Sequence, residues 1–337
     1  MPDEPSTGTV TIPDKIVHTG DTDTAIRFPD NDNISFETGG TERLDITSSG
    51  IDVTGTAGAD ALNVTGTSIV ATLKSTNNNY VVQMQGNNAS DKVYFGTTSG
   101  NDFLLANGSG VTERIRITAD GQILVGVTAA RTMLSGYTPS LQVEGTANSD
   151  SSLSIVENIS AASGPSIWFG KTRGGSLGDN TVVQDGDELG TIVFNGADGT
   201  DVQSMGAFIR ASVDGTPGSN DMPGRITIHT TADGASSPTE RLRISSDGAV
   251  MIGTTTEGHS DTDNLTIADS ANSGITIRSG ASSQGAIYFS DTTSGTGEYQ
   301  GFIGYNQGTN NLFLGANTGT KATIDSSGNM TLNSGNL

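Results

Sequence analysis

The sequence predicts an all-β fold, an elongated fibre of repeated short strands and β-hairpins. Three observations predict it: a turn-rich composition, short β-branched and aromatic runs, and one phrase that recurs along the chain. Only 33% of the 337 residues are hydrophobic and 46 are glycine, whereas an average globular chain is about 45–50% apolar. A single large core is therefore not expected, and the abundant glycine indicates many turns.

The apolar residues form short clusters that favour strands over disorder. Low hydrophobicity with a net charge of -21 is also typical of disordered chains. The β-branched and aromatic residues, however, gather in runs such as 225–229 (Arg-Ile-Thr-Ile-His) and 286–289 (Ala-Ile-Tyr-Phe). Such runs, bounded by turn residues, predict strands.

The recurring phrase is Thr-Glu-Arg followed by alternating apolar residues and a glycine, and a second apolar run follows each copy. Because glycine readily adopts positive φ, two strand-like runs joined in this way predict a β-hairpin. The copies are 41–50, 112–121, 239–248 and a degenerate 319–328. A search for such self-similarity is the first step in assigning a repeat architecture.

Two further phrases accompany the hairpin. An aromatic run occurs at 26–28, 93–96, 167–170 and 287–290, and an apolar triplet at 62–64, 141–143 and 265–267. We interpret the triplet as an opening strand, so that one module runs from opening strand to aromatic strand, variable middle and closing hairpin. The predicted divisions are 1–20 (N-terminal attachment segment), 21–56, 57–128, 129–138 (linker), 139–255 (with a large insertion) and 256–337.

Such thin modules predict association between copies of the chain. A short strand that alternates apolar and polar residues covers one face only, and ordering costs about 1–2 kcal/mol per residue. We therefore expect the missing apolar contacts to come from other copies. Composition does not fix their number.

Four stretches carry a further signal: 17–28, 186–196, 213–224 and 238–254, the last reading Pro-Thr-Glu-Arg-Leu-Arg-Ile-Ser-Ser-Asp-Gly-Ala-Val-Met-Ile-Gly-Thr. They resemble a repeat of tail fibres of tailed bacteriophages, particularly those of marine and cyanobacterial hosts. The resemblance implies an intertwined homotrimer in the virion, made in the host cytoplasm and used in host attachment. It also implies other tail or virion proteins as partners of the N-terminal region, and a host surface glycan or protein as a further candidate partner.

Two alternatives stay open: a head-attached fibre or decoration protein, and a tailspike-like polysaccharide depolymerase. We do not expect an enzyme, and no catalytic residue, cofactor or metal site is predicted. The absence of cysteine excludes thiolate chemistry, and the acidic balance of 37 to 16 disfavours nucleic acid. No stretch is apolar enough for membrane insertion, and the N-terminus lacks an export-signal pattern.

The candidate sites are mostly interpreted as structural. The Glu-Arg of each phrase is expected to form a charge pair that begins a strand and sets register, and to bridge neighbouring chains. With the hairpin glycines, these residues are Glu42, Arg43, Gly50, Glu113, Arg114, Gly121, Glu240, Arg241, Gly248 and Gly328. Trp168 is favoured as a strand residue, with a sugar-stacking platform as the alternative. Tyr299, Phe302 and Tyr305, from an aromatic-rich last module, are candidate receptor contacts.

Overall fold

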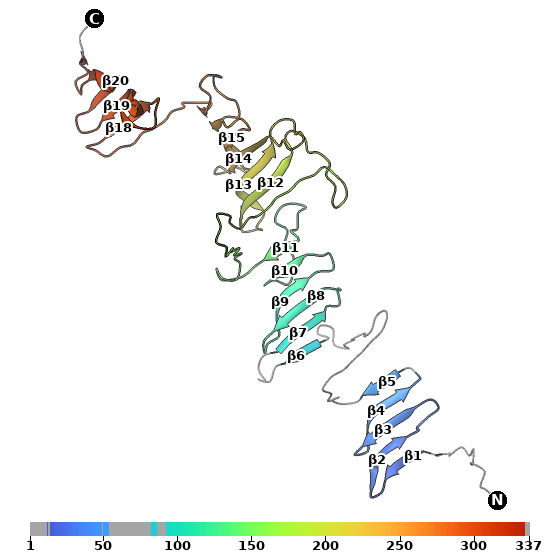
Figure 1. Cartoon of the computed structure of the whole chain (residues 1–337). Coiled ribbons are helices and arrows are strands. Elements are labelled where there is room, and N and C mark those ends of the chain that lie inside the picture. The colour runs from blue at the N-terminus through green and yellow to red at the C-terminus, as the bar shows by residue number, and fades with distance from the viewer. Residues whose placement is uncertain (1–11, 13, 49, 54–81, 86–91, 334–337) are drawn as a thin grey trace, which may run out of the picture. The chain divides into compact units, whose positions relative to one another are not determined.

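The computed structural model describes residues 12, 14–48, 50–53, 82–85 and 92–333. The chain divides into two compact units, 1–77 and 78–337. The described residues form strands joined by turns and irregular segments, with one short 3-10 helix, η1, at Gly295–Tyr299 (Figure 1). The predicted all-β class is confirmed. Among these residues no helix is long and apolar enough to cross a membrane.

The strands form four sheets. The first contains β1 (Lys15–His18), β2 (Asp21–Arg27), β3 (Ile34–Thr38), β4 (Thr41–Thr47) and β5 (Gly50–Val53). The second contains β6 (Val82–Gln85), β7 (Lys92–Thr97), β8 (Phe103–Asn107), β9 (Thr112–Ile117), β10 (Ile123–Val125) and β11 (Leu141–Val143). The third contains β12 (Glu188–Gly196), β13 (Ser204–Val213), β14 (Gly224–Thr230), β15 (Thr239–Ile244), β16 (Val250–Ile252) and β17 (Leu265–Ile267). The fourth contains β18 (Gln284–Phe289), β19 (Gly301–Asn306), β20 (Asn311–Ala316), β21 (Gly319–Ile324) and β22 (Met330–Leu332).

One five-stranded meander is used four times. In every sheet the first five strands lie in chain order, each antiparallel to the next. The Thr-Glu-Arg phrase is always the fourth strand, and the run after it is the fifth. Because neighbours in sequence are neighbours in the sheet, most contacts are local.

A bulge recurs between the third and fourth strands. Phe36 faces Leu44, whereas Glu37 faces Glu42, which leaves Arg43 as the extra residue. The same shift leaves Arg114, Arg241 and Lys321 unpaired in register in the other sheets. An extra residue bends the strand and re-aims its side chain. The arginine of the phrase is thus the bulge residue.

The predicted hairpin turns are confirmed. Gly121, Gly248 and Gly328 have φ of 86°, 94° and 83°. Each glycine N–H donates to the carbonyl three residues earlier, as Gly121 does to Thr118 at 2.9 Å. This is the geometry of a tight hairpin loop that ends in a left-handed residue. Gly50 also has positive φ, 147°.

The predicted opening strands pair differently from the expected module. β11 and β17 form as strands, but each lies parallel to the fifth strand of the preceding sheet. They therefore end a sheet instead of opening the next, and the third predicted triplet, 62–64, lies outside the described residues. Strand pairing consequently groups 141–143 and 265–267 with the segments before them, and 15–18 with the first sheet.

A glycine makes this parallel pairing possible. Gly126 and Gly253 follow the fifth strands with φ of 80° and 74°. A Cβ on either would overlap a backbone carbonyl oxygen, that of Glu144 or Ala268. Only a residue without a side chain lets the sixth strand approach so closely.

One predicted strand is wrong. Residues 167–170 (Ile-Trp-Phe-Gly) form no strand, although the other three aromatic runs overlap β2, β7 and β18. The physical reason is that the first strand of the third sheet is β12, whose Ile192 and Phe194 provide the alternating apolar residues. The segment 167–169 instead lies against β12.

Candidate assembly surface

Each sheet carries rows of apolar side chains that run across neighbouring strands on one face. The register joins them directly opposite one another, the arrangement in which cross-strand pairs stabilise a sheet. The main rows are Ile16–Ile26–Phe36–Leu44, Val82–Phe95–Leu105–Ile115–Val125–Val143, Ile192–Ile209–Ile228–Leu242–Ile252–Ile267 and Ile287–Ile303–Leu314–Ala322–Leu332. We call the face that carries these rows the apolar face.

A second row lies two residues along each strand on the same face. In the third sheet it runs Gly190–Ala211–Ile226–Ile244–Val250–Leu265. In the second sheet Phe103, Ile117, Ile123 and Leu141 face one another. Alternation with period two places every such residue on one side of the sheet.

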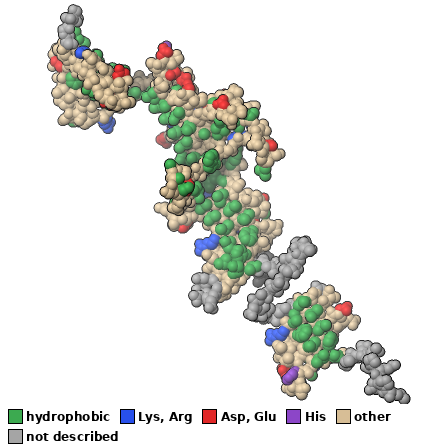
Figure 2. Space-filling view, in the orientation of Figure 1, with side chains coloured by type: hydrophobic (Ala, Val, Ile, Leu, Met, Phe, Trp, Pro, Cys, Tyr) green, Lys and Arg blue, Asp and Glu red, His purple; other side chains and the backbone are tan. Residues whose placement is uncertain are grey.

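Many side chains of the apolar face are exposed to solvent, and they adjoin one another instead of being scattered singly over the surface. Ile226 is 47% exposed and Ile252 40%, and in the fourth sheet Ile287 is 45% and Ile303 43% exposed. Figure 2 shows hydrophobic side chains gathered over the sheets. A large contiguous apolar patch marks an interaction surface.

Bulky side chains from unpaired segments fill gaps in the second row. A Cβ on Gly190 would lie 2.7 Å from the Phe169 side chain, and one on Gly285 would lie 3.1 Å from Ile277 Cγ2. Gly190 and Gly285 hold the same place in the first strands of the third and fourth sheets. In both, an apolar side chain from before the sheet occupies the space that the glycine leaves.

The opposite face, here called the covered face, holds the small core and most charged strand residues. Leu124 is fully buried and lies in register between Arg116 and Gln142. Met251, 2% exposed, lies likewise between Arg243 and Thr266. The charged side chains therefore lie beside the buried residues, where their aliphatic stems can cover apolar surface.

The repeated glutamate pairs with the arginine three residues later. Glu113 accepts two hydrogen bonds of 2.7 Å from Arg116, and Glu240 accepts two of 2.8 and 2.9 Å from Arg243. Such bidentate pairs are the strong form of ion pair. The hydrogen bonds to Glu113 raise the pKa of Arg116 above its usual value.

The expected pairing of adjacent Glu and Arg is thus replaced. In each phrase the arginine donates to the preceding strand: Arg43 to Thr38 and Arg241 to Thr230 at 3.1 Å, and Arg114 to Asn107 at 2.7 Å. In a regular strand, residues an even number of positions apart lie on the same face, and residues an odd number apart lie on opposite faces. The repeated glutamate and the arginine three residues later therefore share a face only because the bulge lies between them. A bridge between neighbouring chains stays a prediction.

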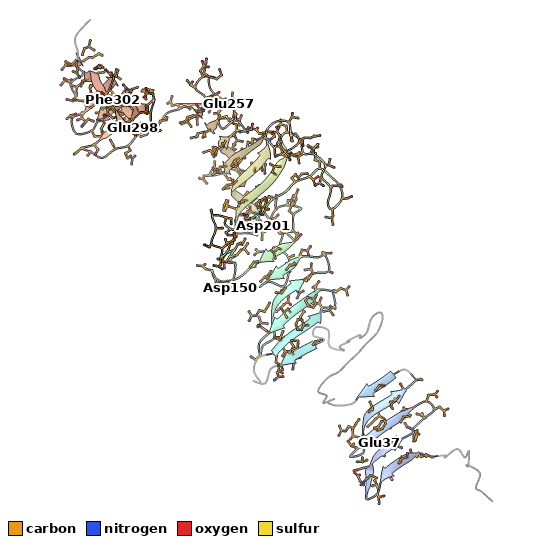
Figure 3. The ribbon with its side chains drawn as sticks, in the orientation of Figure 1. Glu37, Asp150, Asp201, Glu257, Glu298 and Phe302 are labelled. Carbon is orange, nitrogen blue, oxygen red and sulfur yellow. The ribbon has the colours of Figure 1, made fainter. Side chains whose placement is uncertain are left out.

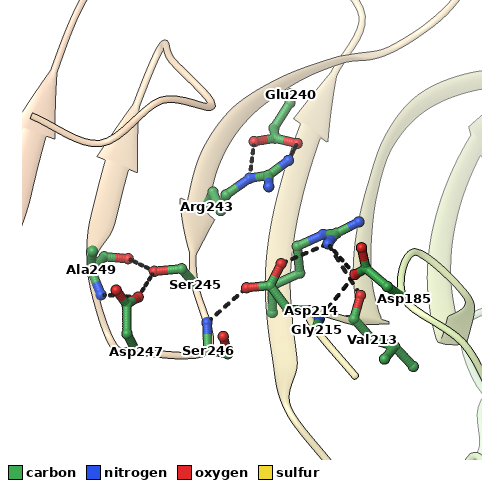
Figure 4. A network of polar contacts seen from close by, with 11 residues as sticks. Asp185, Val213, Asp214, Gly215, Glu240, Arg243, Ser245, Ser246, Asp247 and Ala249 are labelled. Carbon is green, nitrogen blue, oxygen red and sulfur yellow. Dashed lines mark hydrogen bonds and ion pairs between the residues drawn. The ribbon is translucent and has the colours of Figure 1, made fainter. Parts of the chain in front are cut away.

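In the second and third sheets, an aspartate from the loop between the second and third strands binds the turn of the closing hairpin. Asp102 accepts from the Ala119 amide at 3.0 Å, and Asp214 accepts from the Ser246 amide at 2.9 Å. Each also binds an arginine, Arg116 or Arg225, at 2.7 Å. Figure 4 shows the network of the third sheet, in which Asp185 and Asp247 extend it to neighbouring turns.

The hydrogen-bond donors around Asp102 and Asp214 determine the protonation state of these two side chains. The Ala119 amide holds the pKa of Asp102 below its usual value, aided by Arg116. Burial raises the pKa of Asp214, but hydrogen bonds from Arg225 and Ser246 outweigh it, so that the net shift is downward. Both side chains are therefore ionised at neutral pH, which fixes the charge pattern of the covered face.

The aromatic residues singled out as candidate contact residues do not all lie on the same face of a sheet. Trp168, predicted as a strand residue, is 89% exposed and lies in the unpaired segment beside β12. Phe302 lies on the covered face of the fourth sheet, and Tyr299 lies near it, because both line one depression. Tyr305 lies on the apolar face opposite Leu312, so that the structure does not bring the three together.

Comparison with known proteins gives structural likenesses that include two bacteriophage tail-fibre domains. No family model and no curated protein matches the chain. The carboxy-terminal domain of the bacteriophage T5 L-shaped tail fibre is similar at 17% identity and a TM-score of 0.37, covering 62% of this chain and 91% of that one. The same domain with its intramolecular chaperone gives 16% identity and a TM-score of 0.38, covering 68% of each chain. Values this low do not establish a shared fold.

Proposed function

We propose that this chain is a structural tail-fibre subunit of a bacteriophage virion, assembled as a homotrimer through its apolar faces. The observation that carries the proposal is the exposed apolar face repeated in all four sheets. It supports a self-association surface because each copy offers the same chemistry along its length. Most charged side chains of the strands, such as those of Arg116, Arg210 and Arg243, lie on the covered face, away from this surface.

The energy of association favours such an assembly. Completing the burial of a half-exposed Ile or Leu contributes about 1 kcal/mol. The rows of four sheets supply many such side chains, enough to exceed an association cost of roughly 4–15 kcal/mol. Association between copies would therefore be stable even though each chain carries a net charge of -21.

An assembly of three chains can cover the apolar face of every single-layered sheet. Three sheets around one axis can turn every apolar face inward and every covered face outward. The resemblance of the repeated phrase to phage tail fibres supports the same number. Two sheets packed face to face would also cover the apolar face. A measurement of the mass in solution distinguishes the dimer from the trimer.

The wider role follows from this assembly. The N-terminal region would attach the fibre to other virion proteins, and the covered faces of the later sheets would be presented to the host cell. The role is structural and not catalytic. The recurring network of Asp102 and Asp214 would keep each hairpin in place while the fibre bears load.

Light scattering on the purified full chain tests the proposal. We expect a mass three times the 34.4 kDa of one chain, and a monomer would contradict it. A dimer would keep the apolar interface and overturn the number. Ile228→Asp, in the middle of the third-sheet row, is expected to abolish the trimer, while the apolar control Ile228→Val should retain it. Far-UV circular dichroism verifies that both variants keep their strands.

A further inference from the structure

The fourth sheet carries a depression on its covered face with a volume of about 570 Å³. It is lined by Tyr288, Glu298, Tyr299, Phe302 and Thr318. Tyr288 and Phe302 come from neighbouring strands, with ring centroids 5.9 Å apart. Glu298 and Tyr299 come from η1, and Thr318 from the turn between β20 and β21. Figure 3 shows Phe302 and Glu298 in this part of the chain.

Two glycines lie beside Phe302 at places where the third sheet has large residues. Phe208, which occupies the place of Phe302, is stacked on His229 with centroids 4.1 Å apart, and Arg210 lies 4.5 Å above its ring. In the fourth sheet the residues at these two places are Gly315 and Gly304. A Cβ on Gly315 would overlap the Phe302 ring, so that this ring lies directly on the glycine backbone.

The result is an open aromatic surface in one sheet and a closed one in the other. Phe208 is only 7% exposed, whereas Phe302 at the same place is half-buried, and the neighbouring Tyr288 and Tyr299 are 56% and 39% exposed. The charged cap of the third sheet is missing from the fourth. In its place, rings from β18, β19 and η1 surround a space of the size that small ligands occupy.

A strained residue stands at the rim. Thr318 has φ of 60° and follows Asn317 at 48°, whereas the corresponding turn of the first sheet uses Gly39 and Gly40 at 61° and 68°. A β-branched residue rarely adopts this conformation. Glycine would relieve the strain, and strained residues of this kind gather at ligand sites. The conformation places the Thr318 side chain at the depression.

We propose that this depression binds one neutral hexose ring of a surface glycan. The apolar C–H face of a pyranose stacks on aromatic rings, and its hydroxyls bond to carboxylate and hydroxyl groups such as those of Glu298, Tyr299 and Thr318. Glu298 is the charged member of the lining, so an anionic sugar is disfavoured. The inference deepens the proposed function and rests on it for one point, that the covered face stays outward in the assembly.

Saturation-transfer NMR on the full chain tests the inference. The probes are methyl glycosides of glucose, galactose and mannose, with methyl glucuronide as the anionic comparison. We expect saturation transfer to at least one neutral glycoside and at least fivefold less to the glucuronide. No transfer to any of them, or equal transfer to the glucuronide, overturns the proposal.

Three variants locate the site. Tyr299→Ala should weaken binding roughly tenfold, because it removes an aromatic contact. Thr318→Gly should weaken binding severalfold while it raises thermal stability, which excludes misfolding as the cause. The control Trp168→Ala removes an exposed aromatic outside the depression and should leave binding unchanged. Loss of binding in Trp168→Ala alone would place the site elsewhere and overturn the proposal.

The mass of the same sample separates this inference from the proposed function. A trimer that binds no glycoside contradicts the saccharide site only. A monomer that binds a neutral glycoside through Tyr299 contradicts the assembly and leaves the site in place. The two results are obtained on one preparation, so that neither failure can be mistaken for the other.

Discussion

The third and fourth sheets share a strand order and differ on their covered faces. In the third, Phe208 is buried between His229 and Arg210; in the fourth, Gly315 and Gly304 hold these two places, and the half-buried Phe302 ring lies directly on Gly315. Their apolar faces keep the same aliphatic rows. The difference teaches that the aliphatic rows of the apolar face repeat from sheet to sheet, whereas the residues around the aromatic ring of the covered face do not.

The two sheets also differ at their ends. The third gains a parallel sixth strand, β17, which approaches so closely that Gly253 cannot carry a side chain. The fourth sheet ends at β22 among the described residues. The third is therefore joined to the segment that follows it by backbone hydrogen bonds, such as Ala268 N–H to the Ile252 carbonyl at 3.0 Å.

The largest expected effect comes from Gly253→Ala. Its φ of 74° and the overlap with the Ala268 carbonyl together predict a loss of about 3–5 kcal/mol, because backbone must shift. Gly328→Ala in the fourth sheet is the matched control: its φ is 83° but nothing lies within 4 Å of a Cβ. It should cost only about 1–2 kcal/mol. Denaturant unfolding measures both, and equal losses would refute the role of the sixth strand.

A smaller effect is expected from Gly315→Ala. The new methyl group would overlap the Phe302 ring, so that the ring must leave its place at a cost of about 1–3 kcal/mol. The depression would be reshaped, and the aromatic circular dichroism should change. His229→Ala, at the matching place in the third sheet, should leave glycoside binding unchanged. Unaltered aromatic signals in Gly315→Ala would show that the ring does not depend on the glycine.

Much of the fold could be predicted from the sequence because its signals are local. The Thr-Glu-Arg phrase and its glycine identify the fourth and fifth strands, and Gly121 and Gly248 take the predicted left-handed conformation. Alternation with period two predicts one apolar face. What alternation does not give is which strands pair, so that 141–143 and 265–267 were expected to open a sheet although they end one.

The candidate site was less predictable because it depends on register. Glu113 meets Arg116 and not Arg114 only because a bulge intervenes. Tyr299, Phe302 and Tyr305 look equivalent in sequence, yet the odd spacing of 302 and 305 places them on opposite faces. The sequence signal for the depression was the pair Gly304 and Gly315, at the places where the third sheet has Arg210 and His229. This signal can be recognised only after the strands of the two sheets have been aligned.

The smallest expected effect is a pH dependence of the third sheet alone. Burial lowers the pKa of His229 below its ordinary value of 6.5, and the charges of Arg210 and Arg243 act in the same direction against the opposing charge of Glu240. The unfolded chain therefore binds more protons than the folded chain between the lowered pKa and 6.5. Stability rises with pH wherever this holds, so that the contribution is complete above 6.5 and is lost as pH falls toward the lowered value.

Hydrogen-exchange protection measured from pH 7.5 down to 5 tests this dependence sheet by sheet. Protection of the Phe208 and Ile228 amides should fall through this range, whereas that of the Phe302 and Leu314 amides should not, because 284–332 contains no histidine. In His229→Gln the difference between the sheets should disappear, since glutamine does not titrate. A parallel loss in both sheets would instead indicate a carboxylate effect on the whole chain, and the stacked histidine would then have no separate influence on the third sheet.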